Sequence, residues 1–88
     1  MKMIRFECIA ENGLHARPAA MISKCAKHFE SKCYVINEAN QKRADARSVT
    51  AIMTLGVKKG NSVCVECSGT DEEIAARTLA ELIAKIEE

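Results

Sequence analysis

The side chains best suited to chemistry lie within residues 12–20, which read Asn-Gly-Leu-His-Ala-Arg-Pro-Ala-Ala. His15 lies two residues before Arg17, and Pro18 follows at once. Proline is favoured in the first turn of a helix, where its missing N–H costs nothing, and Gly13 can supply an unusual backbone conformation just before that turn. We therefore expect His15 and Arg17 at a helix N-terminus, where unpaired N–H groups and the helix dipole attract anions.

These residue types suit the transfer of a phosphoryl group. An imidazole is partly neutral near pH 7, so a ring nitrogen of His15 offers a nucleophilic lone pair without a separate base. A helix N-terminus also disfavours the charged imidazolium. The Arg17 guanidinium can bind phosphoryl oxygens, as can the backbone N–H groups of Ala16 and Arg17. The competing interpretation is a histidine with a surface or capping role, which is the commoner role of a lone histidine before a helix.

The string from Gly13 to Ala19 resembles the active-site signature of HPr, the histidine-containing phosphocarrier of the phosphoenolpyruvate-dependent sugar phosphotransferase system. Residues 46–56 are similar to the helix-B region of that family. A weaker likeness continues through Lys59-Gly60 to residues 68–72, so the resemblance covers essentially the whole chain.

The resemblance implies a phosphocarrier rather than an enzyme with its own small-molecule substrate. Enzyme I, charged by phosphoenolpyruvate, would donate a phosphoryl group to His15, and an enzyme IIA domain would accept it during sugar uptake. Arg17 would be the phosphate clamp. In the family the attacking atom is Nδ1, whereas the residues alone leave the choice between Nδ1 and Nε2 open. Neither a metal nor an organic cofactor is implied.

A partner-docking patch is expected beside the histidine, because one face of the first helix continues from the His15 site. The resemblance adds the second helix, where the family uses exposed apolar residues to dock its partners. Exposed methionines suit a surface that binds several different proteins. The predicted patch consists of Ala16, Ala20, Lys24, Lys27, Val49 and Met53. The competing interpretations are a solvated basic face for the first helix and core packing for the two apolar residues of the second.

Ser48 is a predicted N-cap of the second helix. In many Gram-positive HPr proteins the matching serine is phosphorylated by a dedicated kinase, which switches the carrier toward transcriptional control. The family commonly shows Lys-Ser-Ile-Met-Gly, whereas residues 47–51 read Arg-Ser-Val-Thr-Ala. Thr50 thus replaces an apolar contact residue, so a plain cap and a regulated cap both stay open.

Two further functions are compatible with the resemblance. The chain could be a regulatory module that acts through Ser48, binding an HPr kinase/phosphorylase and a transcriptional regulator while His15 stays idle. Regulatory relatives characteristically lack the active histidine, so His15 favours the carrier. The third possibility is a carrier in a phosphorelay that does not serve sugar uptake.

Hydropathy patterning predicts the elements that position these residues, in the order βαββαβα. Strands are expected at residues 3–9, 33–39, 42–46 and 63–67, and helices at residues 18–29, 48–55 and from residue 70 onward. Thr70 and Glu73 read as a capping box. The last helix is expected to bury an apolar stripe of Ile74, Thr78, Leu79, Leu82, Ile83 and Ile86.

The predicted fold class is α+β, with helices packed on one face of a sheet. The resemblance implies the HPr-like open-faced sandwich: a four-stranded antiparallel sheet in the order 1-4-2-3, covered on one side by three helices. The family register would direct Val35 and Asn37 inward. Residues 1–88 are expected to form a single domain.

Composition excludes several other functions. A net charge of +1 with one tyrosine, two phenylalanines and no tryptophan offers no footprint for nucleic acid. No apolar run approaches the length of a membrane span, and the first residues alternate with charges unlike a signal peptide. We therefore expect a cytoplasmic protein, with a monomer as the default state.

The five cysteines are an odd number, which favours free thiols in a reducing compartment. Cys64 and Cys67 have CxxC spacing, but residues three apart on a strand point to opposite faces and cannot readily bind one metal. Packing is therefore their expected role. His28, late in the first helix, is assigned no chemistry.

Overall fold

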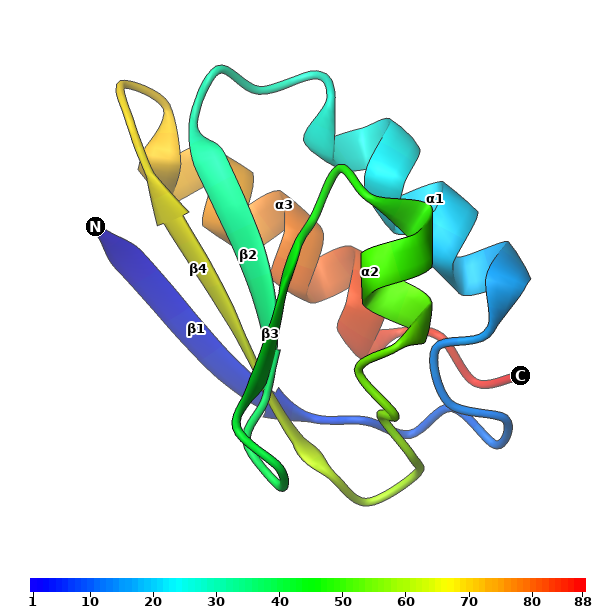
Figure 1. The fold of residues 1–88 in the computed structure, drawn as a ribbon. Helices are drawn as coiled ribbons and strands as arrows, with labels where there is room; N and C mark the ends of the chain where they lie inside the picture. The colour runs from blue at the N-terminus through cyan, green and yellow to red at the C-terminus, as the bar shows by residue number, and fades with distance from the viewer.

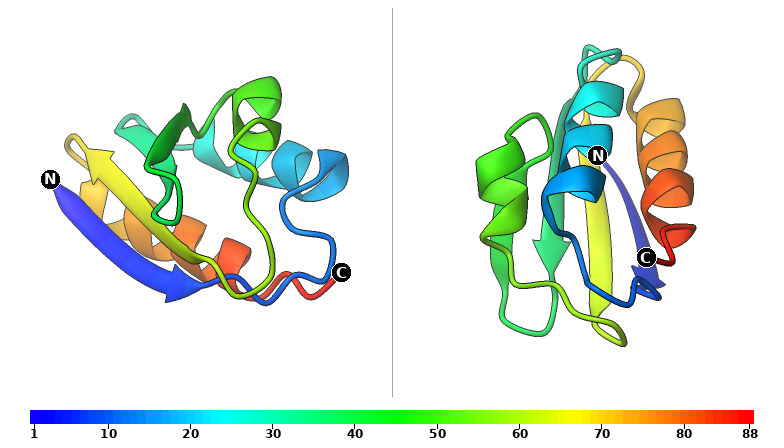
Figure 2. Two further views of the ribbon diagram at one scale, coloured as in Figure 1. Left: turned by 60° about the horizontal axis from the view of Figure 1, so that its bottom comes forward. Right: turned by 90° about the vertical axis from the view of Figure 1, so that its right-hand side faces the viewer.

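Four strands form one antiparallel sheet in the order β1-β4-β2-β3, as predicted. The computed structural model describes all residues 1–88 (Figure 1). The elements are β1 (Lys2–Glu7), α1 (Ala16–Ala26), β2 (Lys32–Asn37), β3 (Lys42–Asp45), α2 (Val49–Met53), β4 (Ser62–Ser68) and α3 (Glu72–Ala84). The three helices lie on one side of the sheet (Figure 2). The predicted element order and two-layer architecture are confirmed, and the ends of the elements differ from the predicted ones by at most three residues.

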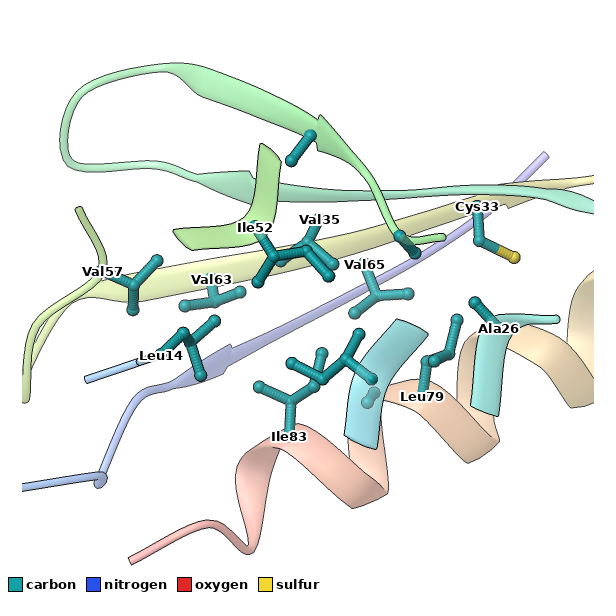
Figure 3. Close-up of a cluster of buried hydrophobic side chains, with 14 of the residues drawn as sticks. Leu14, Ala26, Cys33, Val35, Ile52, Val57, Val63, Val65, Leu79 and Ile83 are labelled. Atoms are coloured by element: carbon teal, nitrogen blue, oxygen red, sulfur yellow. The ribbon is translucent and has the colours of Figure 1, made fainter. Parts of the chain in front are cut away.

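The core lies between the sheet and the helices and is built by alternating strand residues. Val63 and Val65 of β4 point into it, opposite Leu79 and Ile83 of α3 (Figure 3). Cys67 of the same strand also belongs to the core. Ala44 of β3 and Ala46, just beyond it, are also buried. No helix is long and apolar enough to cross a bilayer.

Asn37 is fully buried, as its predicted inward register requires. Its Nδ2 donates to the Leu55 carbonyl at 3.0 Å, and its Oδ1 accepts from the Ala39 N–H at 3.0 Å. A buried amide is tolerated when both ends are hydrogen-bonded. The side chain thus holds the end of β2 against the segment that leaves α2, before the turn at Gly56 (φ +67°).

Helix α1 begins two residues earlier and ends three residues earlier than predicted. Pro18 is its third residue, a position whose N–H would have no acceptor within the helix. At the other end the chain tightens, because the His28 N–H bonds to the Cys25 carbonyl and the Phe29 N–H to the Ala26 carbonyl. His28 is exposed just beyond the helix end.

The predicted capping box at the start of α3 is wrong. The N-cap is Asp71, and its carboxylate does not cap α3. It accepts instead from the N–H groups of Glu30 and Ser31, each at 2.9 Å, and from the Ser31 hydroxyl. Glu72, rather than Glu73, reaches back to the Gly69 N–H at 3.2 Å. The capping side chain is therefore used to bind the connection between α1 and β2.

The predicted apolar stripe of α3 is rotated in the structure. Ile74 is 57% exposed, contrary to the prediction, while Thr78 and Leu82 are half-buried. Small side chains allow the helix to approach the sheet closely, and the residues that face the core are Ala75, Ala76, Leu79, Ala80 and Ile83.

Acidification should remove the stabilising effect of Asp71. Hydrogen bonds from the Ser31 hydroxyl, and then from the Glu30 N–H, lower the pKa of this carboxyl. Since the folded-state pKa lies below the unfolded value of about 3.9, the stabilisation is complete above that value and is lost as the pH falls through the folded-state pKa. Near pH 7, Asp71→Asn should therefore have its unfolding midpoint at a lower urea concentration than wild type. The difference between the two midpoints should vanish in acid.

The control for this prediction is Glu73→Gln, which removes the same charge from an exposed residue of the same helix turn. Urea unfolding followed by circular dichroism between pH 2 and 7 measures both variants. A difference between Asp71→Asn and wild type that persists unchanged at pH 2 would contradict the account.

Candidate functional site

The loop before α1 is held rigidly by Gly13. This residue is buried with φ +65°, and a Cβ built on it would lie 2.0 Å from the Val57 carbonyl oxygen. Its N–H bonds to the Ala10 carbonyl at 3.1 Å, and the next side chain, Leu14, enters the core. Only glycine permits this close approach of two backbone segments. The loop therefore fixes the position of His15.

His15 is the N-cap of α1, in extended conformation (φ −82°, ψ −169°). Its carbonyl accepts from the Ala19 N–H at 2.9 Å, while its side chain makes no capping bond and stays free for other chemistry. The N–H groups of Ala16 and Arg17 have no acceptor. The predicted position of His15 and Arg17 at a helix N-terminus is confirmed, and two backbone donors face outward there.

The His15 ring presents its two nitrogens differently. The residue is half-buried beside a hollow lined also by Asn12, Met53 and Lys58. Nε2 is enclosed and has no hydrogen-bond partner. Nδ1 has no hydrogen-bond partner either and is not enclosed. The ring nitrogen available to an incoming group is therefore Nδ1.

Arg17 extends into solvent with a side chain that is 71% exposed. Its Nη1 forms an ion pair with Glu88 Oε1 at 2.8 Å. The last residues reach this point because the Glu11 N–H bonds to the Glu87 carbonyl, which places the C-terminal segment beside the start of α1 (Figure 1). The sequence analysis missed Glu88, since no local pattern connects residues so far apart. An exposed pair is worth little, so the guanidinium can leave it readily.

The six residues of the predicted docking patch are not equivalent. Helix α2 lies beside α1 (Figure 1). Met53 is 46% exposed and lines the hollow at His15. Val49 is half-buried and packs partly against the core. The α1 members are all exposed, from the first turn to just beyond the helix end: Ala16, Ala20, Lys24 and Lys27.

Ser48 is the N-cap of α2, as predicted. Its Oγ accepts from the Ala51 N–H at 3.1 Å, and the residue is half-buried. A contact that the sequence analysis missed fixes the preceding residue, because the buried Ser23 Oγ donates to the Arg47 carbonyl at 2.6 Å. The start of α2 is therefore tied to the middle of α1.

Cys64 and Cys67 point to opposite faces of the sheet, as expected from their spacing. Cys67 faces the core, whereas Cys64 lies on the helix-free face between Arg5 and Ile36. No group of three or more histidine, cysteine, aspartate or glutamate side chains comes together to hold a metal ion.

Comparison with known proteins places this geometry in a family. The family model described as the PTS HPr component phosphorylation site matches residues 3–85. The phosphocarrier protein HPr of Borreliella burgdorferi is 39% identical, over 98% of this chain and 100% of that protein. The multiphosphoryl transfer protein 1 of Escherichia coli K12 is also 39% identical over 94% of this chain, which spans only 10% of that longer protein.

The fold agrees with these matches. A crystal structure of HPr from Thermoanaerobacter tengcongensis superposes with a TM-score of 0.85 at 41% identity, covering 94% of this chain and 91% of that one. Because the family model extends over nearly all of the residues and a relative of the same length aligns from end to end, this chain belongs to the HPr family of the phosphotransferase system.

Proposed function

We propose that this chain is a phosphocarrier that relays a phosphoryl group through a phosphohistidine at His15, from enzyme I to enzyme IIA domains in sugar uptake. The observation that supports it most directly is the place of His15 at the N-cap of α1, where the N–H groups of Ala16 and Arg17 have no acceptor and only one ring nitrogen is buried. Residues 1–88 act as one HPr-like domain, and the relay operates in the cytoplasm.

The transfer requires few groups, because phosphoryl transfer depends mainly on positioning and electrostatics. The Nδ1 lone pair of His15 forms a bond to phosphorus while the bond between phosphorus and the donor atom breaks. The proton of the neutral ring stays on Nε2, the enclosed nitrogen. Arg17 exchanges the Glu88 carboxylate for the phosphoryl oxygens, which also meet the N–H groups at the start of α1. Transfer to the acceptor reverses these steps.

The relay is tested with the full chain, phosphoenolpyruvate and enzyme I, followed by intact mass. We expect one phosphoryl group that is lost in acid, as a nitrogen–phosphorus bond requires. Addition of an enzyme IIA domain should return the chain to its original mass. An acid-stable phosphate, or no phosphate at all with an active enzyme I, would contradict the proposal.

Arg17→Ala should slow phosphoryl acceptance by about 100-fold, the typical loss when one donor to a transition-state oxyanion is removed. The variant should stay folded, because its exposed pair with Glu88 contributes at most about 1 kcal/mol. The matched control is Glu88→Gln, which frees the guanidinium and should transfer at least as fast as wild type. Rapid-quench kinetics would measure the rate of phosphohistidine formation in each variant. A wild-type rate in Arg17→Ala would show that Arg17 does not assist the transfer.

Ser48 supports a second, regulatory proposal, because its partly exposed hydroxyl lies at the start of α2, beside the residues of the docking patch. Phosphate there would add negative charge that a helix N-terminus tolerates but that partners must accommodate. Ser48→Ala should unfold about 1 kcal/mol more easily through loss of the N-cap. With ATP and an HPr kinase, wild type should gain an acid-stable phosphate that this variant lacks. Absence of that product in wild type would leave Ser48 as a cap only.

A further inference from the structure

Two cysteines that the phosphocarrier proposal does not use lie opposite each other in the sheet. Cys33 of β2 and Cys67 of β4 are register partners, and both side chains face the helix layer. Cys33 is 5% exposed and Cys67 is 0% exposed, and both thiols are free. In Figure 3 the Cys33 sulfur is directed toward the helices.

The backbone pattern identifies the kind of pair that they form. The Ala46 N–H bonds to the Cys33 carbonyl, so the backbone groups of Cys33 point toward β3. The Glu38 N–H, just after β2, bonds to the Ser62 carbonyl of β4. Because backbone groups alternate in direction along a strand, the residues of β2 that bond to β4 are those an even number of positions from Glu38, which leaves out Cys33. Cys33 and Cys67 are therefore a non-hydrogen-bonded pair.

Such a pair can be bridged without moving the strands. In antiparallel sheets, residues of this class have Cα atoms about 4.5 Å apart and their side chains at closest approach. A disulfide needs a Cα separation of roughly 4.4 to 6.8 Å. The Cys33 Sγ donates to the Ser31 carbonyl at 3.7 Å.

The two thiols differ in reactivity and access. The neighbouring Cys67 lowers the pKa of Cys33, with a smaller contribution from Arg47, and burial opposes them. The neighbouring Cys33 and burial raise the pKa of Cys67. Cys33 also lines a surface hollow together with Lys32, Tyr34, Asp45 and Arg47. Of the two residues only Cys33 borders this hollow, and Cys67 is 0% exposed, so we expect Cys33 to meet a small oxidant first.

We propose that Cys33 and Cys67 are a redox-active pair, which hydrogen peroxide converts into a disulfide between β2 and β4. The Cys33 thiolate attacks one peroxide oxygen: the S–O bond forms, the O–O bond breaks, and the departing hydroxide takes up a proton to become water. The Cys67 sulfur then attacks the sulfenic sulfur: the S–S bond forms, the S–O bond breaks, and a second water leaves with the Cys67 proton. The two thiols lose two electrons, and peroxide is reduced to two waters.

The site lies at the end of the sheet where β2 begins and β4 ends, away from the start of α1 (Figure 1). The disulfide closes a loop that contains β3 and α2, which restricts the unfolded chain. Oxidation should therefore raise the resistance to unfolding. This inference rests on the strand register and on the burial of the two thiols, and it is independent of the proposed relay.

The test treats the full chain with a small excess of hydrogen peroxide, quenches with catalase and counts thiols under denaturing conditions. The five thiols should fall to three, the intact mass should decrease by two hydrogens, and peptide mapping without reductant should link Cys33 to Cys67. The urea midpoint should rise on oxidation and return with dithiothreitol.

Variants separate this pair from the other cysteines. Cys33→Ala should retain all four of its thiols under the same treatment. The matched control is Cys64→Ala. It removes a buried cysteine that lies in β4, like Cys67, but on the helix-free face of the sheet, so this variant should still form the disulfide. Five free thiols in oxidised wild type, a bridge that involves Cys8, Cys25 or Cys64, or a disulfide-linked dimer would each overturn the proposal. The peptide map of oxidised wild type tests the Cys33–Cys67 bridge even if a variant fails to fold.

Discussion

Replacement of His15 by alanine is expected to abolish phosphoryl acceptance from phosphoenolpyruvate and enzyme I. His15 is the N-cap of α1, its Nε2 is enclosed, and the N–H groups of Ala16 and Arg17 that follow it have no acceptor. An alanine leaves those donors in place and removes the nitrogen that the proposed relay bonds to phosphorus. Intact mass after incubation should show no adduct, while circular dichroism should show an unchanged fold, because the His15 side chain makes no hydrogen bond in the structure.

The control is His28→Ala, which removes the other histidine from an exposed position just beyond the opposite end of α1. It should be phosphorylated as fully as wild type. If His15→Ala were labelled to a comparable extent, the phosphoryl group would have to reside on another residue and the relay through His15 would be excluded.

Gly13→Ala is expected to cause the largest loss of stability among single-residue changes near the site, about 3 kcal/mol. A non-glycine residue in the left-handed region costs about 1–2 kcal/mol. The added methyl would also lie 2.0 Å from the Val57 carbonyl oxygen, so the loop or the segment after α2 must move, at an overpacking cost of about 1–3 kcal/mol. Since this loop positions His15, phosphoryl acceptance should fall as well. Urea unfolding and the rate of phosphohistidine formation measure the two effects.

Gly60→Ala separates the two expected causes of the stability loss in Gly13→Ala, which are the positive φ and the contact with the Val57 carbonyl. Gly60 also has positive φ, +93°, but a Cβ there meets nothing within 4 Å. This control should lose only the conformational part, about 1–2 kcal/mol, and should keep the wild-type transfer rate. Equal stability losses in the two variants would show that the contact between Gly13 and Val57 contributes nothing.

The features of the fold that depend on local patterning could be predicted from the sequence. Alternation identified the strands, and proline after a histidine located the start of α1, because a helix begins where its first N–H groups need no partner. The inward register of Asn37 came from the family resemblance. It is physically sound because the Leu55 carbonyl and the Ala39 N–H satisfy the buried amide.

The features that depend on contacts between distant residues could not be predicted. In the sequence Asp71 looks like an ordinary residue at the start of a helix. Only the folded chain brings the connection between α1 and β2 close enough for its N–H groups to bond to the Asp71 carboxylate. The pairing of Arg17 with Glu88 and the opposition of Cys33 and Cys67 likewise require the finished sheet and the returning C-terminal segment. The hollow beside His15 is lined in part by Met53 from another helix, which no pattern local to residue 15 could reveal.

The most direct test of the central claim is a nitrogen NMR spectrum of the chain labelled with ¹⁵N-histidine, recorded before and after phosphorylation by phosphoenolpyruvate and enzyme I. We predict that a phosphorus coupling and a large shift appear at Nδ1 of His15, while Nε2 retains its proton and His28 is unchanged. A coupling at Nε2, which the structure encloses, or a spectrum of His15 that does not change when the chain gains its phosphate, would contradict the account.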